Sequence, residues 1–179
     1  MPTLGRIDQI SHLVRGIAGA CRQWIDTQGI GPWLIVRNLA LVGTHDGVPT
    51  EPLLDVAIAY SGDLQIELIE PRNDAPSPYL AHTRSGELGL HHVAYFEAQD
   101  IDARVAQARR QGLELRFDVR SRLGTRYVYF TPPPAPPPVH APGWIEIVET
   151  DPATRALFEQ LRGEARDWDG SGAVREIVL

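Results

Sequence analysis

Four polar residues lie at matched places in two stretches of the chain: Gln9 and Glu67 in the first, His92 and Glu146 in the second. Their spacings are similar, with 58 positions from Gln9 to Glu67 and 54 from His92 to Glu146. An amide oxygen, two carboxylates and an imidazole together form a ligand set for a divalent cation. Both carboxylates stand between apolar residues, where burial is costly unless a positive charge compensates it. The four residues therefore predict one divalent-metal site.

A second interpretation stays open, in which the four groups are exposed on a solvated face of a sheet. The chain has no short ligand motif such as His-Glu-x-x-His, so the metal hypothesis depends on the repeat and not on local spacing. His91 is predicted on the opposite face from His92, packed or at the surface, and His12 on the opposite face from Gln9. The remaining histidines fall in predicted loops, where we expect them to be solvated: His45, His82 and His140.

The elements that must position these residues follow the same order in both halves. Side chains alternate across a strand, so Glu67 shares a face with Gln65, and Glu146 shares a face with Trp144. In the first half the pattern predicts a strand at 6–15, a helix at 17–28 that ends at Gly29, and strands at 33–42, 54–60 and 63–70. In the second half it predicts a strand at 89–97, a helix at 99–111, and strands at 113–119, 125–131 and 143–149. The chain is thus predicted to contain two β-α-β-β-β units.

These units divide the 179 residues into a first module at 5–72 and a second at 89–150, which together form one α+β domain. The segment 72–88 is the predicted connection. Residues 131–143 hold seven prolines and predict a stiff polyproline-like loop. Residues 151–179 form a C-terminal extension, with a helix from Asp151 to about Trp168 that we expect to pack on the outside of the domain or against a partner chain.

Composition narrows the class of protein. The net charge of −6 argues against a nucleic-acid or anionic-membrane surface. The single cysteine, Cys21, excludes an intramolecular disulfide and lies on an apolar helix face, which favours an inert core thiol over a reactive one. No stretch approaches the length of a membrane span and the first ten residues lack a signal-peptide core, so we expect a cytoplasmic protein.

Five short motifs give the sequence a family resemblance over residues 5–150. They are Gln9-Ile10, the Gly-Ile-Gly-Pro-Trp run at 29–33, the Gln-Ile-Glu-Leu-Ile-Glu-Pro run at 65–71, the Gly-Leu-His-His-Val-Ala run at 89–94, and the Ile-Glu-Ile-Val-Glu run at 145–149. With these motifs the sequence resembles the vicinal-oxygen-chelate superfamily. That superfamily includes glyoxalase I, methylmalonyl-CoA epimerase, extradiol dioxygenases and bleomycin-resistance proteins.

The resemblance implies two tandem βαβββ modules in a cupped mixed sheet, with one divalent metal on Gln9, Glu67, His92 and Glu146. The metal is expected to be Zn, Ni, Co, Mn or Mg. Such a Gln-Glu-His-Glu set is that of eukaryotic-type zinc glyoxalase I, whereas epimerases usually have histidine at the place of Gln9. Extradiol dioxygenases need two histidine ligands, and only His92 stands at a ligand position here.

By resemblance, the expected activity is that of a lyase, isomerase or epimerase that removes a proton next to a carbonyl or thioester, with Glu146 as first candidate for the base and Glu67 as its symmetric partner. Glu51 stands near the position at which epimerases carry an extra carboxylate, although the favoured interpretation is a glutamate in a surface loop. A homodimer is also expected. The alternative function is a non-catalytic protein that sequesters an apolar small molecule.

Two further groups are candidates for substrate binding. Trp33, Phe96 and Trp144 could line a small-molecule site, although each suits the core equally well. Three arginines of the second half could hold an anionic carrier such as CoA or glutathione, although a solvated basic turn is an equal alternative: Arg120, Arg122 and Arg126.

Overall fold

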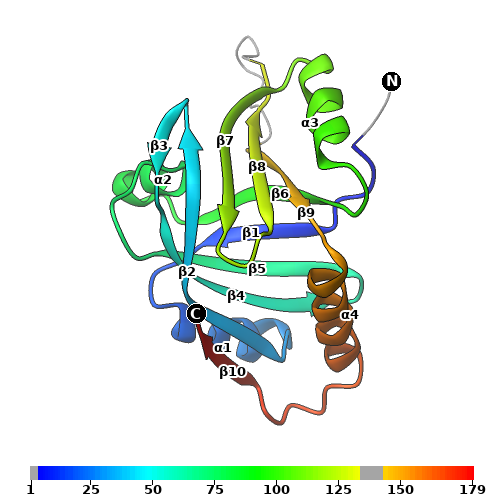
Figure 1. The fold of residues 1–179 in the computed structure, drawn as a ribbon. Coiled ribbons are helices and arrows are strands. Elements are labelled where there is room, and N and C mark those ends of the chain that lie inside the picture. The colour runs from blue at the N-terminus through cyan, green and yellow to red at the C-terminus, as the bar shows by residue number, and fades with distance from the viewer. Residues whose placement is uncertain (1–3, 134–142) are drawn as a thin grey trace.

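A computed structural model describes residues 4–133 and 143–179 (Figure 1). Most of the predicted polyproline-like loop lies outside the described residues. The first half contains β1 (Gln9–Leu13), α1 (Ile17–Gln28), β2 (Trp33–His45), β3 (Val48–Thr50), β4 (Leu53–Ser61) and β5 (Leu64–Pro71). The helix α2 (Pro78–Ser85) leads to the second half, with β6 (Gly89–Glu97), α3 (Ile101–Arg110), β7 (Glu114–Ser121), β8 (Arg126–Thr131) and β9 (Trp144–Glu149). The extension forms α4 (Pro152–Arg166) and β10 (Val174–Val178).

The predicted α+β fold, with two β-α-β-β-β units and a C-terminal helix, is confirmed. One mixed sheet runs in the order β10-β2-β4-β5-β1-β6-β9-β8-β7. The two halves meet at its centre, where β1 pairs with β5 in parallel and with β6 in antiparallel orientation. Figure 1 shows the sheet curving around an interior, with α1 and α3 on its outside.

The sheet also closes on itself, because the far half of β2 pairs with β7 over Leu41–His45. The first half of β2 pairs with β4, and the register shifts between Val36 and Leu39. At this bulge Asn38 has a φ of 58°, a left-handed conformation that asparagine tolerates better than most residues. The buried carboxylate of Asp55 accepts hydrogen bonds from the Asn38 backbone N–H and from the Arg37 guanidinium. The bulge thus turns β2 away from β4 and toward β7.

Three apolar clusters divide the interior. Under α1, the buried residues include Ile17, Cys21 and Trp33, and under α3 they include Ile101 and Phe130. The third cluster fills the inside of the curved sheet and includes Tyr79, Tyr129 and Leu161. The candidate site lies in this third cluster.

Three elements were not predicted, among them β3, which pairs with the end of β2. The helix α2 lies in the segment taken as an irregular connection, and it begins where the Ser77 side chain caps the Leu80 N–H, with Pro78 in its first turn. The strand β10 pairs in parallel with the start of β2. The extension packs on the domain's own sheet through the buried Leu161 of α4. No helix among the described residues is long and apolar enough to cross a membrane.

Candidate metal centre

The four predicted ligands come from four neighbouring strands, because β5, β1, β6 and β9 lie side by side in the sheet. Gln9 pairs with Gln65, two positions before Glu67, and His92 pairs with Trp144, two positions before Glu146. Each half therefore offsets its two candidate ligands by the same diagonal step. Gln9, Glu67 and Glu146 all line one cavity inside the sheet.

Three of the candidate ligands converge closely. One ligand atom from each of Glu67, His92 and Glu146 lies within 4.8 Å of the others. His92 Nε2 is 3.1 Å from Glu146 Oε2 and 3.5 Å from Glu67 Oε2. These three residues are buried, as is Gln9, whose exposed fraction is 3%. The four groups are thus not on a solvated face of the sheet.

The polar atoms of this cluster are poorly satisfied by the protein. Gln9 Oε1, Glu67 Oε2 and His92 Nε2 are buried and have no hydrogen-bond partner in the described part of the chain. Burial and the nearby Glu146 raise the pKa of Glu67 to about 7. Lone pairs that the protein leaves unmatched, next to two carboxylates, fit a divalent cation bound by oxygen and nitrogen.

Gln65 orients the Gln9 amide and was not singled out from the sequence. The Gln9 Nε2 group donates to Gln65 Oε1, and Gln65 Nε2 donates to the Tyr60 hydroxyl at 2.7 Å. With its nitrogen engaged in this way, the Gln9 side chain leaves its oxygen free for a cation. Hydrogen bonds of this kind fix the orientation of metal ligands. The parity of β5, which puts Gln65 on the face of Glu67, was a signal that could have identified it.

His91 orients the His92 ring, as Gln65 orients the Gln9 amide. The prediction that His91 lies on the opposite face from His92 was wrong. In the β1–β6 pairing Ser11 lies opposite His92 and His12 opposite Leu90, so His91 is the extra residue of a bulge. The bulge breaks the alternation, and the His91 ring contacts both His92 and Tyr79 on the inner side. Of the two placements that the sequence left open, packed or at the surface, His91 takes the packed one, since 3% of it is exposed.

A hydrogen-bonded chain leads from His92 through His91 to α2. His91 Nδ1 lies 3.0 Å from His92 Nδ1, and His91 Nε2 lies 3.4 Å from the Pro78 carbonyl oxygen. Burial lowers the pKa of His91 well below its usual value, so the ring is neutral. If the Pro78 carbonyl accepts from His91 Nε2, then His91 Nδ1 accepts from His92 Nδ1. That tautomer leaves the lone pair of His92 Nε2 facing the two carboxylates.

A cavity of about 140 Å³ opens beside the carboxylates. Its walls come from β1, β2, β4, β5, β6, β7, β8 and β9, from α2, and from the C-terminal extension. Besides the candidate ligands, its polar groups are hydroxyls. Two of these, on Tyr79 and Tyr129, are hydrogen bonded to each other at 2.8 Å, and burial raises the pKa of both. The polar groups of the wall are therefore neutral at physiological pH.

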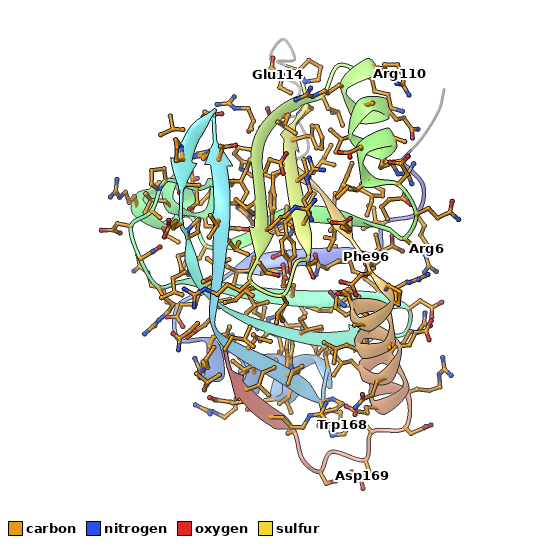
Figure 2. The ribbon with its side chains drawn as sticks, viewed as in Figure 1. Arg6, Phe96, Arg110, Glu114, Trp168 and Asp169 are labelled. Atoms are coloured by element: carbon orange, nitrogen blue, oxygen red, sulfur yellow. The ribbon has the colours of Figure 1, made fainter. Side chains whose placement is uncertain are left out.

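The predicted substrate-binding residues are distributed differently from expectation. Phe96 lines the cavity and packs against Phe158 of α4; Figure 2 shows Phe96 close to that helix. Trp144 stacks on His91 at a centroid distance of 6.3 Å and does not line the cavity. Trp33 belongs to the core under α1, where its exposed fraction is 0%, so the prediction that it lines the site was wrong. The reason is strand parity, which turns Trp33 toward α1 and Leu34 inward.

The three arginines likewise do not line the cavity. Arg120 is paired with Glu149, and Arg126 with Asp118 and Asp102. Arg122 is exposed in the turn between β7 and β8. The carboxylate considered for epimerase chemistry, Glu51, is also exposed, and its backbone carbonyl accepts from Asn73 in a surface turn.

The sequence was compared with known protein families. Residues 8–130 match the glyoxalase/bleomycin resistance protein/dioxygenase superfamily. This chain belongs to that superfamily. The matched range covers Gln9, Glu67 and His92, and it ends before Glu146 and the C-terminal extension. A comparison with curated protein sequences gives no match.

Two solved structures have a fold similar to that of this chain. A hypothetical protein from Bacillus halodurans is 19% identical with a TM-score of 0.54, covering 80% of this chain and 93% of its own. Methylmalonyl-CoA epimerase from Mycobacterium tuberculosis is 20% identical with a TM-score of 0.53, covering 84% of this chain and 91% of its own. At these identities the likeness shows the fold alone.

Proposed function

We propose that this superfamily member is a metal-dependent enzyme of the lyase or isomerase class, either glyoxalase-like or epimerase-like. It removes a proton next to a carbonyl or thioester group of a small substrate. The observation that carries the proposal is the cluster of unsatisfied buried atoms, Gln9 Oε1, Glu67 Oε2 and His92 Nε2, beside Glu146 at the floor of a cavity. A binding protein for apolar molecules has no need of two buried carboxylates.

A divalent metal held by Gln9, Glu67, His92 and Glu146 would act as a Lewis acid on the substrate oxygen and make the adjacent C–H group more acidic. The protein's own part is to accept and return the proton. The carboxylate of Glu146 takes the proton, and the electron pair of the C–H bond moves into the carbonyl group. Return of the proton to the same carbon from the other side gives an epimer, and return to a neighbouring carbon gives an isomer.

Glu67 is the second proton acceptor in this proposal, by the symmetry of the two halves. In the metal-free protein burial and the nearby Glu146 raise its pKa to about 7, and a bound cation would favour its ionised form, which can accept a proton. Tyr79 and Tyr129 keep their hydroxyls protonated in the wall of the cavity, and the Phe96 and Phe158 rings, which also line it, pack against each other. CoA or glutathione conjugates remain candidate substrates, and a homodimer remains the proposed assembly.

The proposal is tested by metal analysis of the purified protein and of His92→Ala, with His45→Ala as the matched control. His45 lies on β2 against Phe117, outside the cluster. We expect about one metal per chain in the parent and in His45→Ala, and a loss of at least tenfold in metal affinity for His92→Ala. A parent without metal affinity, or a His92→Ala variant with unchanged affinity, would contradict the site.

Catalysis is tested separately, by assays of thioester epimerisation and hemithioacetal isomerisation and by exchange of substrate hydrogen with deuterated water. Glu146→Gln keeps the size of the side chain and removes the base, so turnover and exchange per bound metal ion should fall by at least a hundredfold, with the metal content of the variant measured because Glu146 is also a proposed ligand.

The second candidate function is sequestration of an apolar molecule, and the apolar cavity beside the cluster favours it. Tight binding of an apolar ligand by metal-free protein, together with no turnover or exchange in the metal-loaded protein, would support this candidate against the enzyme.

A further inference from the structure

The wall of the cavity beside the candidate metal centre is mainly apolar, and apart from Gln9, Glu67 and Glu146 its polar side chains are hydroxyls of tyrosine, serine and threonine. From the curved sheet come Val36, Leu39, Leu41, Leu54, Val56, Ile58, Ile69, Phe96, Leu123 and Val148. The C-terminal extension adds Leu157 and Phe158 from α4, together with Ile177 and Leu179 at the chain end. Several of these residues are partly exposed and form an apolar rim, including Leu123 at 71% and Leu157 at 38%.

No arginine is among the residues that line this cavity in the described part of the chain. Arg37 of β2, which contacts the extension, is engaged with the carboxylates of Asp55 and Glu176. The charges inside are the two carboxylates of Glu67 and Glu146, which balance one divalent cation. A negative charge on the substrate body would then meet hydroxyl groups but no positively charged side chain of the cavity wall, and burial of a charge without a counter-charge is costly.

The volume limits the substrate as well. An apolar protein cavity of roughly 150 Å³ holds a benzene molecule, and the cavity here measures about 140 Å³. One aromatic ring or a short branched aliphatic group therefore fits beside the carboxylates. A nucleotide does not fit inside.

The C-terminal extension is fixed in place as the outer wall. β10 pairs with β2 over five residues, and Glu176 receives two hydrogen bonds from Arg37, at 3.0 and 2.9 Å. The Leu179 N–H donates to the Arg37 carbonyl at 3.1 Å. Trp168 lies against Gly31, where an added Cβ would come within 2.7 Å of its ring. Alternation along β10 turns Glu176 outward and Ile177 and Leu179 toward the cavity.

From this geometry we infer that the cavity selects an uncharged, largely apolar group, about the size of one benzene ring, next to the carbonyl group of the substrate, and that α4 and β10 are the specificity-determining wall. This inference rests on the proposed function for the position of the carbonyl group. The preference for an uncharged body rests on the cavity wall itself. The two can therefore be tested apart.

The test uses two probes with the same hydroxyketone end, 2-hydroxyacetophenone and its 4-carboxylate derivative, titrated calorimetrically into the full-length protein. Both the zinc-loaded and the metal-free forms are measured. We expect the uncharged ketone to bind at least tenfold more tightly than the carboxylate in both forms. Equal or tighter binding of the carboxylate, or no binding of either probe, would overturn the inference.

Leu157→Arg tests the role of the extension, with Val48→Arg as the matched control. Leu157 is at the rim of the cavity, whereas Val48 is an exposed residue of β3 that does not line it. The rim arginine should raise the affinity for the carboxylate at least fivefold, and Val48→Arg should change it less than twofold. The same affinity change in both variants would overturn the assignment of the wall. A preserved preference in a protein that shows no hydrogen exchange would refute the proposed function and leave this inference standing.

Discussion

At the scale of single residues, the candidate metal centre depends on two side chains that are not ligands. Gln65 engages the nitrogen of the Gln9 amide, and His91 engages Nδ1 of the His92 ring. Both hydrogen bonds leave the ligand atom pointing into the cluster. The two halves of the chain thus supply one ligand pair and one orienting group each.

His91→Leu should weaken metal binding although His91 is not a ligand. Loss of the Nδ1 contact frees the His92 ring to turn and to change tautomer, and loss of such a partner typically lowers metal affinity about 10–100-fold. His45→Leu is the matched control and should leave the affinity unchanged. The measurement is competition with a chromogenic chelator, and equal affinities for the two variants would contradict the role of His91.

Metal affinity should fall as the pH is lowered through about 7. The carboxyl of Glu67 has its pKa raised to about 7 in the metal-free protein, by burial and by Glu146. Below that pH a proton occupies Glu67 and the cation must displace it, whereas above it the group is already ionised. The contribution of this group approaches tenfold per pH unit on the acid side and vanishes on the alkaline side.

Glu67→Gln provides the comparison for the pH series. This variant should bind the metal more weakly than the parent. Its affinity should not show the part of the decrease at low pH that protonation of Glu67 causes in the parent. An identical pH dependence in the parent and in Glu67→Gln would contradict the assignment of the raised pKa to this carboxyl.

At the scale of elements, the sequence was informative wherever structure is local. The helix at 17–28 was predicted with its observed bounds, and the strands that carry the four candidate ligands were predicted from alternation. The bulge at His91 was not visible in the sequence, because it depends on how β6 meets β1. Strand β10 was missed for a similar reason, since it forms only against β2 more than a hundred residues away. Helix α2 had a start signal in Ser77 and Pro78 that was passed over.

The helix α1 buries Cys21, and this leads to a simple chemical prediction. Burial raises the pKa of the Cys21 thiol to about 12, so the reactive thiolate is nearly absent at pH 8. The folded protein should therefore resist iodoacetamide, while the protein in denaturant should take up one equivalent. Mass spectrometry gives the count, and rapid modification without denaturant would show that α1 detaches readily from the sheet.

At the scale of the whole molecule, closure of the sheet depends on Gly43. It pairs with Val119 of β7, and a Cβ at this position would come within 2.1 Å of the Asp118 carbonyl oxygen. Backbone cannot yield to such a contact without separating β2 from β7. The sequence contains no pattern that predicts this pairing, because it joins a strand of the first half to a strand of the second half and closes the curved sheet.

Gly43→Ala should lower the free energy of unfolding by about 1–3 kcal/mol, the usual cost of forcing extra atoms into a packed site. Gly19→Ala is the matched control, because Gly19 lies in α1 with no neighbouring atom within 4 Å. That substitution should be neutral or stabilise the protein by up to about 1 kcal/mol. Urea unfolding monitored by tryptophan fluorescence measures both, and equal stabilities would show that the closure tolerates a side chain.

Because β5, β1, β6 and β9 lie side by side, a bound cation would also affect the stability of the sheet. A cation bound to all four ligands would tie together residues 9, 67, 92 and 146, and so act as a four-way cross-link in a chain whose one cysteine rules out an intramolecular disulfide. Each tie spans a long stretch of sequence, so it removes loop-closure entropy from the unfolded chain in the manner of a staple. Opening the centre of the sheet then requires release of the ion, and the lifetime of the folded state becomes coupled to the residence time of the metal.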